Sequence, residues 1–197
     1  LGSRVSWYRN SSDSYTQAWD YWQRNRSQEN GQVTPFAALI YDLDDTWSVY
    51  ASYADIFQPQ STYTKADGSA LQPKTGASYE VGLKAEWLQG RLNGAFNLFR
   101  NTEEGRAEAD YNSVCTASSD GYCYTDSGKV RAQGFEAELS GELIERLQVL
   151  AGYTYTQVEY LKRIDDTRQD ATFTASYVPR HMARVWTNYD LDGALQR

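Results

Sequence analysis

The sequence predicts an all-β protein, and three features support this prediction. Segments in which apolar and polar residues alternate recur along the whole chain of 197 residues, and they are rich in β-branched and aromatic residues. No stretch sustains the 3.6-residue period of an amphipathic helix. The connections between the alternating segments switch regularly between more than 20 residues and only a few. Antiparallel strands with hairpin turns at one edge and long loops at the other explain this pattern.

Eight strands are expected from the alternation, at residues 3–9, 33–41, 46–56, 79–88, 91–102, 130–143, 147–160 and 182–190. The long connections between them are 10–32, 57–78, 103–129 and 161–181. The short connections are 42–45, 89–90 and 144–146. Because loops above about 12–15 residues are uncommon in compact domains, four of them at one edge predict that this edge carries the function.

The two faces of the predicted strands differ in charge. On the strand at 79–88, one face carries Val81, Leu83, Ala85 and Trp87, and the other carries Glu80, Gly82, Lys84 and Glu86. Five further strands divide similarly, at 46–53, 92–99, 134–143, 147–156 and 182–189. The apolar faces of these six strands contain no charged residue. The strand at 33–41 is ambiguous, because it is apolar on both faces.

Two architectures fit this alternation. In a soluble β-sandwich the apolar face packs on a second sheet, whereas in a transmembrane β-barrel it meets lipid and the polar face lines the lumen. Small residues on the apolar faces and strands of ten or more residues favour the barrel. So does a set of aromatic residues beside the short turns, which is typical of an interfacial girdle: Tyr41, Trp47, Trp87 and Tyr189.

Composition excludes several other classes. The chain has 19 Lys plus Arg and 26 Asp plus Glu, a net charge of −7, whereas a nucleic-acid binder presents a basic face. Its mean hydropathy is −0.69, and its longest apolar run is the six residues 36–41. A membrane-spanning helix needs about 20 apolar residues. Aromatic residues make up 14% of the chain, which argues against disorder.

The two cysteines, Cys115 and Cys123, lie in one predicted loop with a glycine between them. This spacing suits a local disulfide in an oxidising compartment, and two free loop thiols are the alternative. A zinc site is not expected, because His181 is the one histidine of the chain and two thiols do not complete a tetrahedral shell.

Five stretches resemble the C-terminal half of the TonB-dependent outer-membrane siderophore receptors, in particular the ferric-pyoverdine and hydroxamate types. They are residues 48–60, 71–84, 128–143, 150–156 and 179–189, in the order of that family. The resemblance implies that the chain forms about eight of the roughly 22 strands of a large antiparallel transmembrane β-barrel. Residues 1–197 are then part of the barrel domain, and no plug domain is expected within them.

The resemblance also implies a function. The receptor would lie in the outer membrane of a Gram-negative bacterium and bind a ferric siderophore at extracellular loops. Import would be energised by the TonB complex, reached through an N-terminal part that these residues do not contain. The partners implied are the siderophore, outer-membrane lipid and TonB, with no nucleic acid. Neither catalysis nor a resident cofactor or metal site is implied, because the siderophore itself chelates the iron.

Loop aromatic residues are the candidate ligand contacts, because their rings supply rigid contact area with a polar tip. They are Trp19, Tyr21, Trp22, Tyr63, Tyr111, Tyr122 and Tyr124. The carboxylates Glu136, Glu138 and Glu142 are interpreted as lumen-wall residues, with three candidate partners: Arg100, Arg131 and Arg184.

Two other functions are weighed against this one. A soluble β-sandwich could bind carbohydrate or protein through its long loops. A barrel enzyme would need a Ser/His/Asp or paired acidic site at its rim, and His181 has no such match nearby in the sequence.

Overall fold

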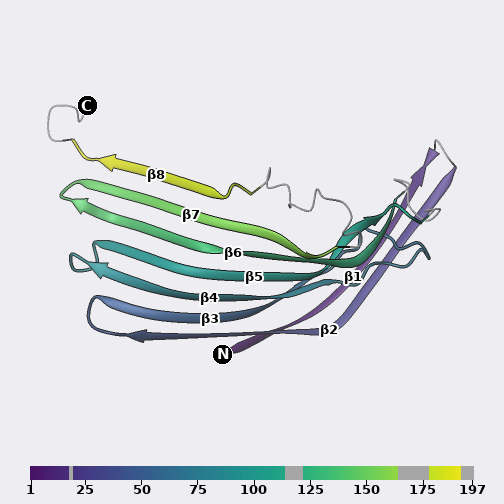
Figure 1. Ribbon diagram of the computed structural model, residues 1–197, viewed down its shortest axis with the longest axis horizontal. Helices are drawn as coiled ribbons and strands as arrows, with labels where there is room; N and C mark the ends of the chain where they lie inside the picture. Colours follow the sequence, from purple (N-terminus) through teal and green to yellow (C-terminus); the bar gives the residue numbers. More distant parts are fainter. Residues whose placement is uncertain (18–19, 114–121, 164–177, 192–197) are drawn as a thin grey trace.

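The chain folds into eight β-strands in a computed structural model that describes residues 1–17, 20–113, 122–163 and 178–191 (Figure 1). The strands are β1 (Gly2–Thr16), β2 (Tyr21–Asp42), β3 (Trp47–Gln58), β4 (Lys74–Trp87), β5 (Leu92–Asp110), β6 (Cys123–Ile144), β7 (Leu147–Lys162) and β8 (His181–Tyr189). All eight predicted strands are present. None of the described residues lies in a helix that is long and apolar enough to cross a membrane.

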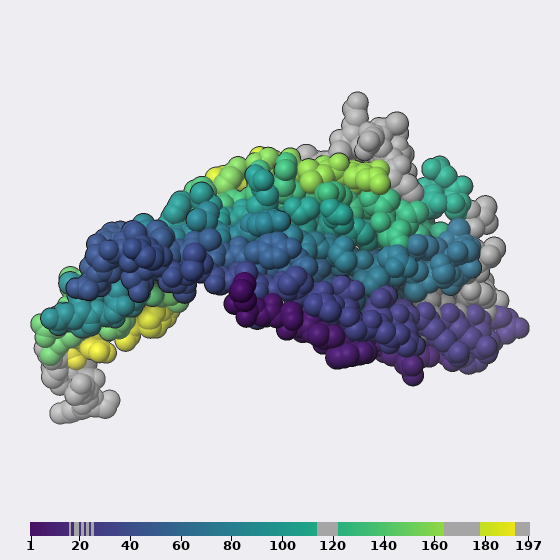
Figure 2. Space-filling model, turned by 90° about the horizontal axis from the view of Figure 1, so that it is seen from below, coloured from purple at the N-terminus to yellow at the C-terminus, as the bar shows by residue number. Residues whose placement is uncertain are grey.

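The strands form a single antiparallel sheet in the order β1 to β8, so that each strand pairs with the next along the chain. The sheet is curved along its length like an arch (Figure 2). The described residues contain no second sheet that could cover the apolar face. The β-sandwich alternative is therefore wrong, and the up-and-down order is that of a barrel wall.

The register confirms the division into two faces, because directly paired residues point to the same side of a sheet. One row of paired residues crosses six strands and consists of Val49, Leu83, Phe96, Ala137, Tyr153 and Ala183. We call the side that carries this row the apolar face. The opposite side, the polar face, carries the row Tyr50, Gly82, Asn97, Glu136 and Thr154.

The sheet has almost no protein core of its own. Among the described residues only four hydrophobic side chains are buried, Leu71, Ala85, Cys123 and Val130. Leu39 and Val185, in contrast, are 72% and 73% exposed on the apolar face. A face of this size without a protein partner matches a surface that meets lipid.

The aromatic residues predicted for a girdle all lie on the apolar face beside the short turns. Trp47 and Trp87 pack edge to face, with ring centroids 5.5 Å apart and an interplanar angle of 85°. Tyr41 and Tyr189 lie toward the two sides of the sheet and are more than half exposed. This placement suits rings that sit at a membrane interface.

The short turns are stabilised locally. Asp44 accepts hydrogen bonds from the backbone N–H groups of Thr46 and Trp47, each at 2.8 Å, and so closes the β2–β3 turn. The β4–β5 turn has positive φ at Leu88, Gln89 and Gly90, of 54°, 60° and 86°. Only the glycine adopts this conformation without steric cost.

The predicted long loops are shorter than expected. Most of 10–32 is a two-stranded ribbon, in which β1 and β2 pair up to Thr16 and Tyr21. Likewise, β5 continues to Asp110 and β6 begins at Cys123, within the predicted loop 103–129. These segments are polar and have low β propensity, but their backbone groups pair across the ladder, and context overrides propensity in strands. Of the predicted loop 161–181, residues 164–177 lie outside the described part.

Candidate functional site

The candidate site is the edge at which the long connections lie, opposite the short turns (Figure 1). Its best-defined part is the β3–β4 loop, residues 59–73, which folds back against β5 and β6. Within the loop, Thr64 and Ala70 form an isolated antiparallel bridge. Thr64 is only 2% exposed, so the loop is packed rather than extended into solvent.

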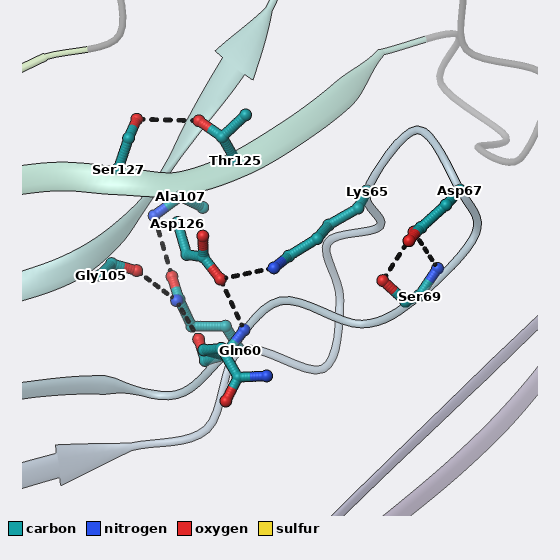
Figure 3. A network of polar contacts seen from close by, with 10 residues as sticks. Gln60, Lys65, Asp67, Ser69, Gly105, Ala107, Thr125, Asp126 and Ser127 are labelled. Carbon is teal, nitrogen blue, oxygen red and sulfur yellow. Dashed lines mark hydrogen bonds and ion pairs between the residues drawn. The ribbon is translucent and has the colours of Figure 1, made fainter.

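Gln60 connects this loop to β5 (Figure 3). Its Nε2 donates hydrogen bonds to the carbonyl oxygens of Gln72 and Gly105, at 2.8 and 2.6 Å. Its Oε1 accepts a hydrogen bond from the backbone N–H of Ala107 at 3.0 Å. The side chain is 7% exposed, and a buried amide with this many partners is costly to remove.

A second contact connects the loop to β6. The Nζ of Lys65 lies 2.8 Å from a carboxylate oxygen of Asp126, and the backbone N–H of Gln72 donates to the same oxygen at 3.2 Å (Figure 3). Burial by itself would raise the pKa of Asp126, but the hydrogen bonds from Lys65 and Gln72 and the lysine charge hold that pKa below its ordinary value. At neutral pH Asp126 is therefore ionised beside the Lys65 ammonium group.

The loop tip and the end of β5 each contain an Asp-centred turn. Asp67 accepts hydrogen bonds from the hydroxyl and the backbone N–H of Ser69, and they lower the pKa of Asp67. Asp110 accepts hydrogen bonds from the hydroxyl of Ser113 and the backbone N–H of Asn112, which lower its pKa in the same way. These turns shape the edge, and both carboxylates are already hydrogen-bonded within them.

The structure brings the predicted aromatic contacts together in pairs. Tyr63 of the loop packs on Tyr124 of β6, with centroids 4.6 Å apart. The backbone N–H of Tyr124 donates to the carbonyl of Thr64 at 3.0 Å, which holds this pair in place. Tyr111 and Tyr122 meet edge to face at 5.8 Å. Tyr111 and Tyr122 are 60% and 49% exposed.

The remaining predicted contacts lie on the β1–β2 ribbon. Trp22 packs on Tyr15 with centroids 5.1 Å apart and is exposed. The hydroxyl of Tyr15 donates to Asp20 at 2.8 Å, and this hydrogen bond raises the pKa of Tyr15. Trp19 and the side chain of Tyr21 lie outside the described part of the chain. No described contact joins the ribbon pair to the other two pairs.

The cysteine prediction stays a prediction. Cys115 lies outside the described residues. Cys123 begins β6 opposite Asp110 and is 1% exposed. Cys123 lies between Tyr122 and Tyr124 in the sequence. A disulfide at this cysteine would therefore restrict the backbone next to two candidate ligand contacts.

The charged residues of the polar face have other partners than predicted. Glu142 pairs with Arg91 at 3.1 Å, and Glu136 accepts a hydrogen bond from Thr154. The proposed partners Arg131 and Arg100 lie on the other side of the sheet, as their pairing with Thr102 and Tyr79 shows. They are therefore not partners of the three glutamates. Arg100 and Arg131 continue the alternation of Leu98 and Phe135 on the apolar side of β5 and β6, with no register shift in between. In the described part of the chain no group of three His, Cys, Asp or Glu residues could hold a metal ion.

Sequence reasoning missed the two residues that organise the edge, Gln60 and Asp126. A glutamine in a polar loop carries no local signal of burial. Asp126 lies in a segment that was expected to be a loop, and its partners are 54 and 61 residues away along the chain.

Comparison with known proteins agrees with this architecture. Residues 1–196 match the family model described as TonB dependent receptor-like, beta-barrel. The chain is 54% identical over 199 aligned residues to the ferric-pyoverdine M114 receptor PbuA of Pseudomonas sp. strain M114, covering all of this chain and 23% of that receptor. It is 40% identical over 173 residues to the ferripyoverdine receptor of Pseudomonas aeruginosa, covering 86% of this chain and 20% of that receptor.

The fold is that of a solved receptor. A crystal structure of the ferripyoverdine receptor of the outer membrane of Pseudomonas aeruginosa, bound to ferripyoverdine, superposes with a TM-score of 0.77 at 37% identity. The match covers 99% of this chain and 24% of that one. The chain thus spans about a fifth to a quarter of the length of the receptors that it matches.

These matches define what the sheet is part of. The family consists of transport receptors and not of enzymes. The open sheet of eight strands corresponds to one section of the barrel wall, and its apolar face is the outer surface of that wall. The chain belongs to the TonB-dependent receptor family, as a section of its outer-membrane β-barrel.

Proposed function

We propose that this chain acts as part of an outer-membrane receptor that takes up a ferric siderophore of the pyoverdine class. One observation carries the proposal: the 54% identity to a ferric-pyoverdine receptor extends over the whole chain, including the long-connection edge. Uptake of a bulky iron chelate through a closed barrel needs energy from the inner membrane, which the TonB complex supplies in this family. Residues 1–197 belong to the barrel domain, so the TonB contact and the plug are assigned to other parts of the receptor.

The aromatic pairs of the edge are proposed as the siderophore contacts. The set is Trp19, Tyr21, Trp22, Tyr63, Tyr111, Tyr122 and Tyr124. Their rings offer large rigid surfaces, and their hydroxyl and indole N–H groups offer hydrogen bonds to the chelate. The Gln60 and Lys65–Asp126 contacts hold the Tyr63–Tyr124 pair in place before the ligand arrives. Preorganisation of this kind lowers the entropic cost of binding.

Uptake of radioactive iron tests the function. A strain that lacks this receptor is complemented with the full-length gene and supplied with ⁵⁵Fe-labelled ferric pyoverdine. We expect accumulation that depends on the complementing gene and disappears when TonB is inactivated. Equal accumulation with and without the gene, for every pyoverdine type supplied, would contradict the proposal.

Binding measurements test the site. Replacing Tyr63 and Tyr124 together by Ala in the full-length receptor removes one aromatic pair. Stacking of a nucleic-acid base on an aromatic side chain, taken as a comparable contact, is worth about 1–3 kcal/mol. We expect the Kd for ferric pyoverdine to rise at least tenfold. Tyr189→Ala is the matched control, because this tyrosine is equally aromatic but lies at the opposite, short-turn end. An equal effect of both changes would exclude the edge as the binding site.

A further inference from the structure

The β1–β2 ribbon contains one irregularity, and it changes the direction of a carboxylate. Ser6 pairs with Gln32. The next pair on that side is Tyr8 with Glu29, so that β1 advances by two residues while β2 advances by three. Gly31 lies in this bulge with a φ of 65°, which a glycine adopts without steric cost. In a regular strand residues 29 and 32 would face opposite sides, but the bulge turns both to the same side.

The same point of the ribbon contacts the β3–β4 loop. The hydroxyl groups of Tyr8 and Ser61 lie 2.9 Å apart and share a hydrogen bond. Tyr8 is the direct cross-strand partner of Glu29, so this hydrogen bond fixes the bulged part of the ribbon relative to the loop. The position of Glu29 is therefore defined both by the β1–β2 ladder and by the loop.

Glu29 lines a hollow of about 420 Å³ between the ribbon and the β3–β4 loop. Glu29 and Gln32 contribute the lining from β2, and Gln72 and Pro73 contribute the lining from the loop. The rest of the lining comes from β3 to β6 and consists of Phe57, Thr75, Gly105 and Asp126. The hollow thus combines two carboxylates, two amides and an aromatic ring.

The two carboxylates of the hollow differ in their electrostatic balance. Asp126 lies 2.8 Å from the Nζ of Lys65 and accepts a hydrogen bond from the backbone N–H of Gln72. Glu29, in contrast, has no ion-pair or hydrogen-bond partner among the described residues. The described lining residues include no Lys, Arg or His. The hollow therefore carries one uncompensated negative charge, which is located at Glu29.

The remaining lining residues suit an ammonium group on an alkyl chain. An ammonium group has three N–H donors and no acceptor. The carboxylate of Glu29 and the side-chain amides of Gln32 and Gln72 are three groups that can accept hydrogen bonds. Phe57 and Pro73 offer apolar surface to the methylene groups that carry an ammonium group. An anionic group, in contrast, would be repelled by Glu29.

The hollow lies close to one of the proposed aromatic contacts. Asp126 follows Tyr124 by two residues on β6, which corresponds to about 7 Å along a strand. Tyr63, which packs on Tyr124, belongs to the same loop as Gln72 and Pro73. A chelate that rests on the Tyr63–Tyr124 pair is therefore within reach of the hollow through a chain of a few carbon atoms.

We propose that this hollow binds an ammonium group of the ferric siderophore, carried on an alkyl chain. The Glu29 carboxylate neutralises the charge, and the amides of Gln32 and Gln72 accept the other hydrogen bonds. The inference rests on the proposed siderophore function and adds a requirement on the ligand, namely a primary amine on a short chain beside the chelate. A siderophore without this amine is disfavoured, because it leaves the carboxylate of Glu29 covered and unpaired.

The experiment compares one chelate with and without its ammonium charge. The full-length receptor in neutral detergent is titrated with the ferric pyoverdine that it imports and, separately, with the same iron complex after amine-selective acetylation. Isothermal titration calorimetry gives both Kd values. The unmodified receptor is expected to bind the amine form about tenfold more tightly. Glu29→Gln is expected to weaken binding of the amine form about tenfold and to leave binding of the acetylated form unchanged.

Two further variants keep the test specific. Asp13→Asn is the matched control, because Asp13 lies on the other face of the same ribbon, paired with Arg24. It is expected to leave both Kd values unchanged. Glu29→Asp keeps the charge on a shorter side chain and is expected to retain part of the preference for the amine form.

The outcomes separate the ammonium site from the proposed function. Equal Kd values of the two chelates for the unmodified receptor would overturn the ammonium site and leave the siderophore function intact. So would an imported pyoverdine without a primary amine, or an undiminished preference in the Glu29→Gln variant, with folding verified by heat-modifiable migration. A receptor that binds no ferric pyoverdine at all would overturn both proposals.

Discussion

The membrane band and the long-connection edge of this sheet are stabilised in different ways. In the band, from Trp47 to Tyr53 and from Tyr79 to Trp87, the register is unbroken and each residue is placed by the face on which it falls. At the edge the ladders are irregular, with register shifts between Glu104 and Arg106, between Arg106 and Glu108 and between Lys129 and Val130. There, individual polar side chains such as Gln60 hold the backbone in place.

This difference shows which parts of the wall can change. In the band, any apolar residue of suitable size satisfies the lipid, so that identity matters less than polarity. At the edge, a buried amide or carboxylate has several specific partners, and one substitution leaves all of them unsatisfied. A ligand-binding surface needs buried polar groups with specific partners, because these hold the backbone in one defined shape.

The largest effect is expected for a charge in the middle of the band. Leu83 lies halfway between Trp87 and Tyr79 on the outer face, opposite Val49 and Phe96. Leu83→Arg should lower the free energy of unfolding by about 2–4 kcal/mol in lipid vesicles. Ser52→Arg is the control, because Ser52 lies on the polar face directly opposite Glu80. Denaturant unfolding of the full-length receptor measures both, and equal losses would contradict the assignment of the faces.

A smaller and more local effect is expected for the buried amide at the edge. Gln60→Ala leaves two carbonyls and one N–H without their partner, at a cost of about 1–3 kcal/mol. Hydrogen exchange in loop 59–73 should accelerate, while exchange in the membrane band should not change. Gln58→Ala, at an exposed site two residues earlier, should leave both regions as they are. Acceleration spread evenly over the sheet would show that the two regions are not independent.

The indole pair at the short-turn end should make a smaller contribution to the free energy of unfolding. Trp47 and Trp87 have the edge-to-face geometry for which double-mutant cycles give about 0.5–1.5 kcal/mol. A cycle with Trp47→Ala, Trp87→Ala and the double variant, measured by unfolding in vesicles, should return a coupling energy in this range. A coupling energy near zero would mean that each ring interacts with the membrane interface independently of the other ring.

The smallest effect is expected for the ion pair of the loop, and it depends on pH. Because the pKa of Asp126 is lowered in the folded protein, its contribution is complete above the ordinary pKa of Asp, near 4, and is lost as the pH falls through the lowered value. Asp126→Asn should loosen loop 59–73 by about 0.2–1 kcal/mol at pH 7. Exchange in the variant loop should depend less on pH below 4 than exchange in the unmodified loop. An identical pH profile in both would exclude Asp126 as the responsible group.

Some of the site could be predicted from the sequence and some could not. Tyr63, Tyr111, Tyr122 and Tyr124 were identified by residue type and position between strands, and the structure pairs them. Which tyrosine meets which was not predictable, because β5 and β6 continue well into the predicted loop and set the register there. The expected pairing of Arg131 with the lumen-wall glutamates was wrong, because Arg131 lies on the apolar side with Phe135 and its partner Glu159 lies opposite it on β7.

The sequence by itself determined the two faces of the wall, the short turns and the resemblance to a receptor barrel. Alternation is a local property, since each side chain partitions between lipid and water according to its own polarity, with a period of two residues. Only the tertiary structure decided how the edge is built. The partners of Gln60, Lys65 and Lys129 come from other strands, and contacts over such separations depend on register, bulges and loop path. No local pattern of residues encodes these.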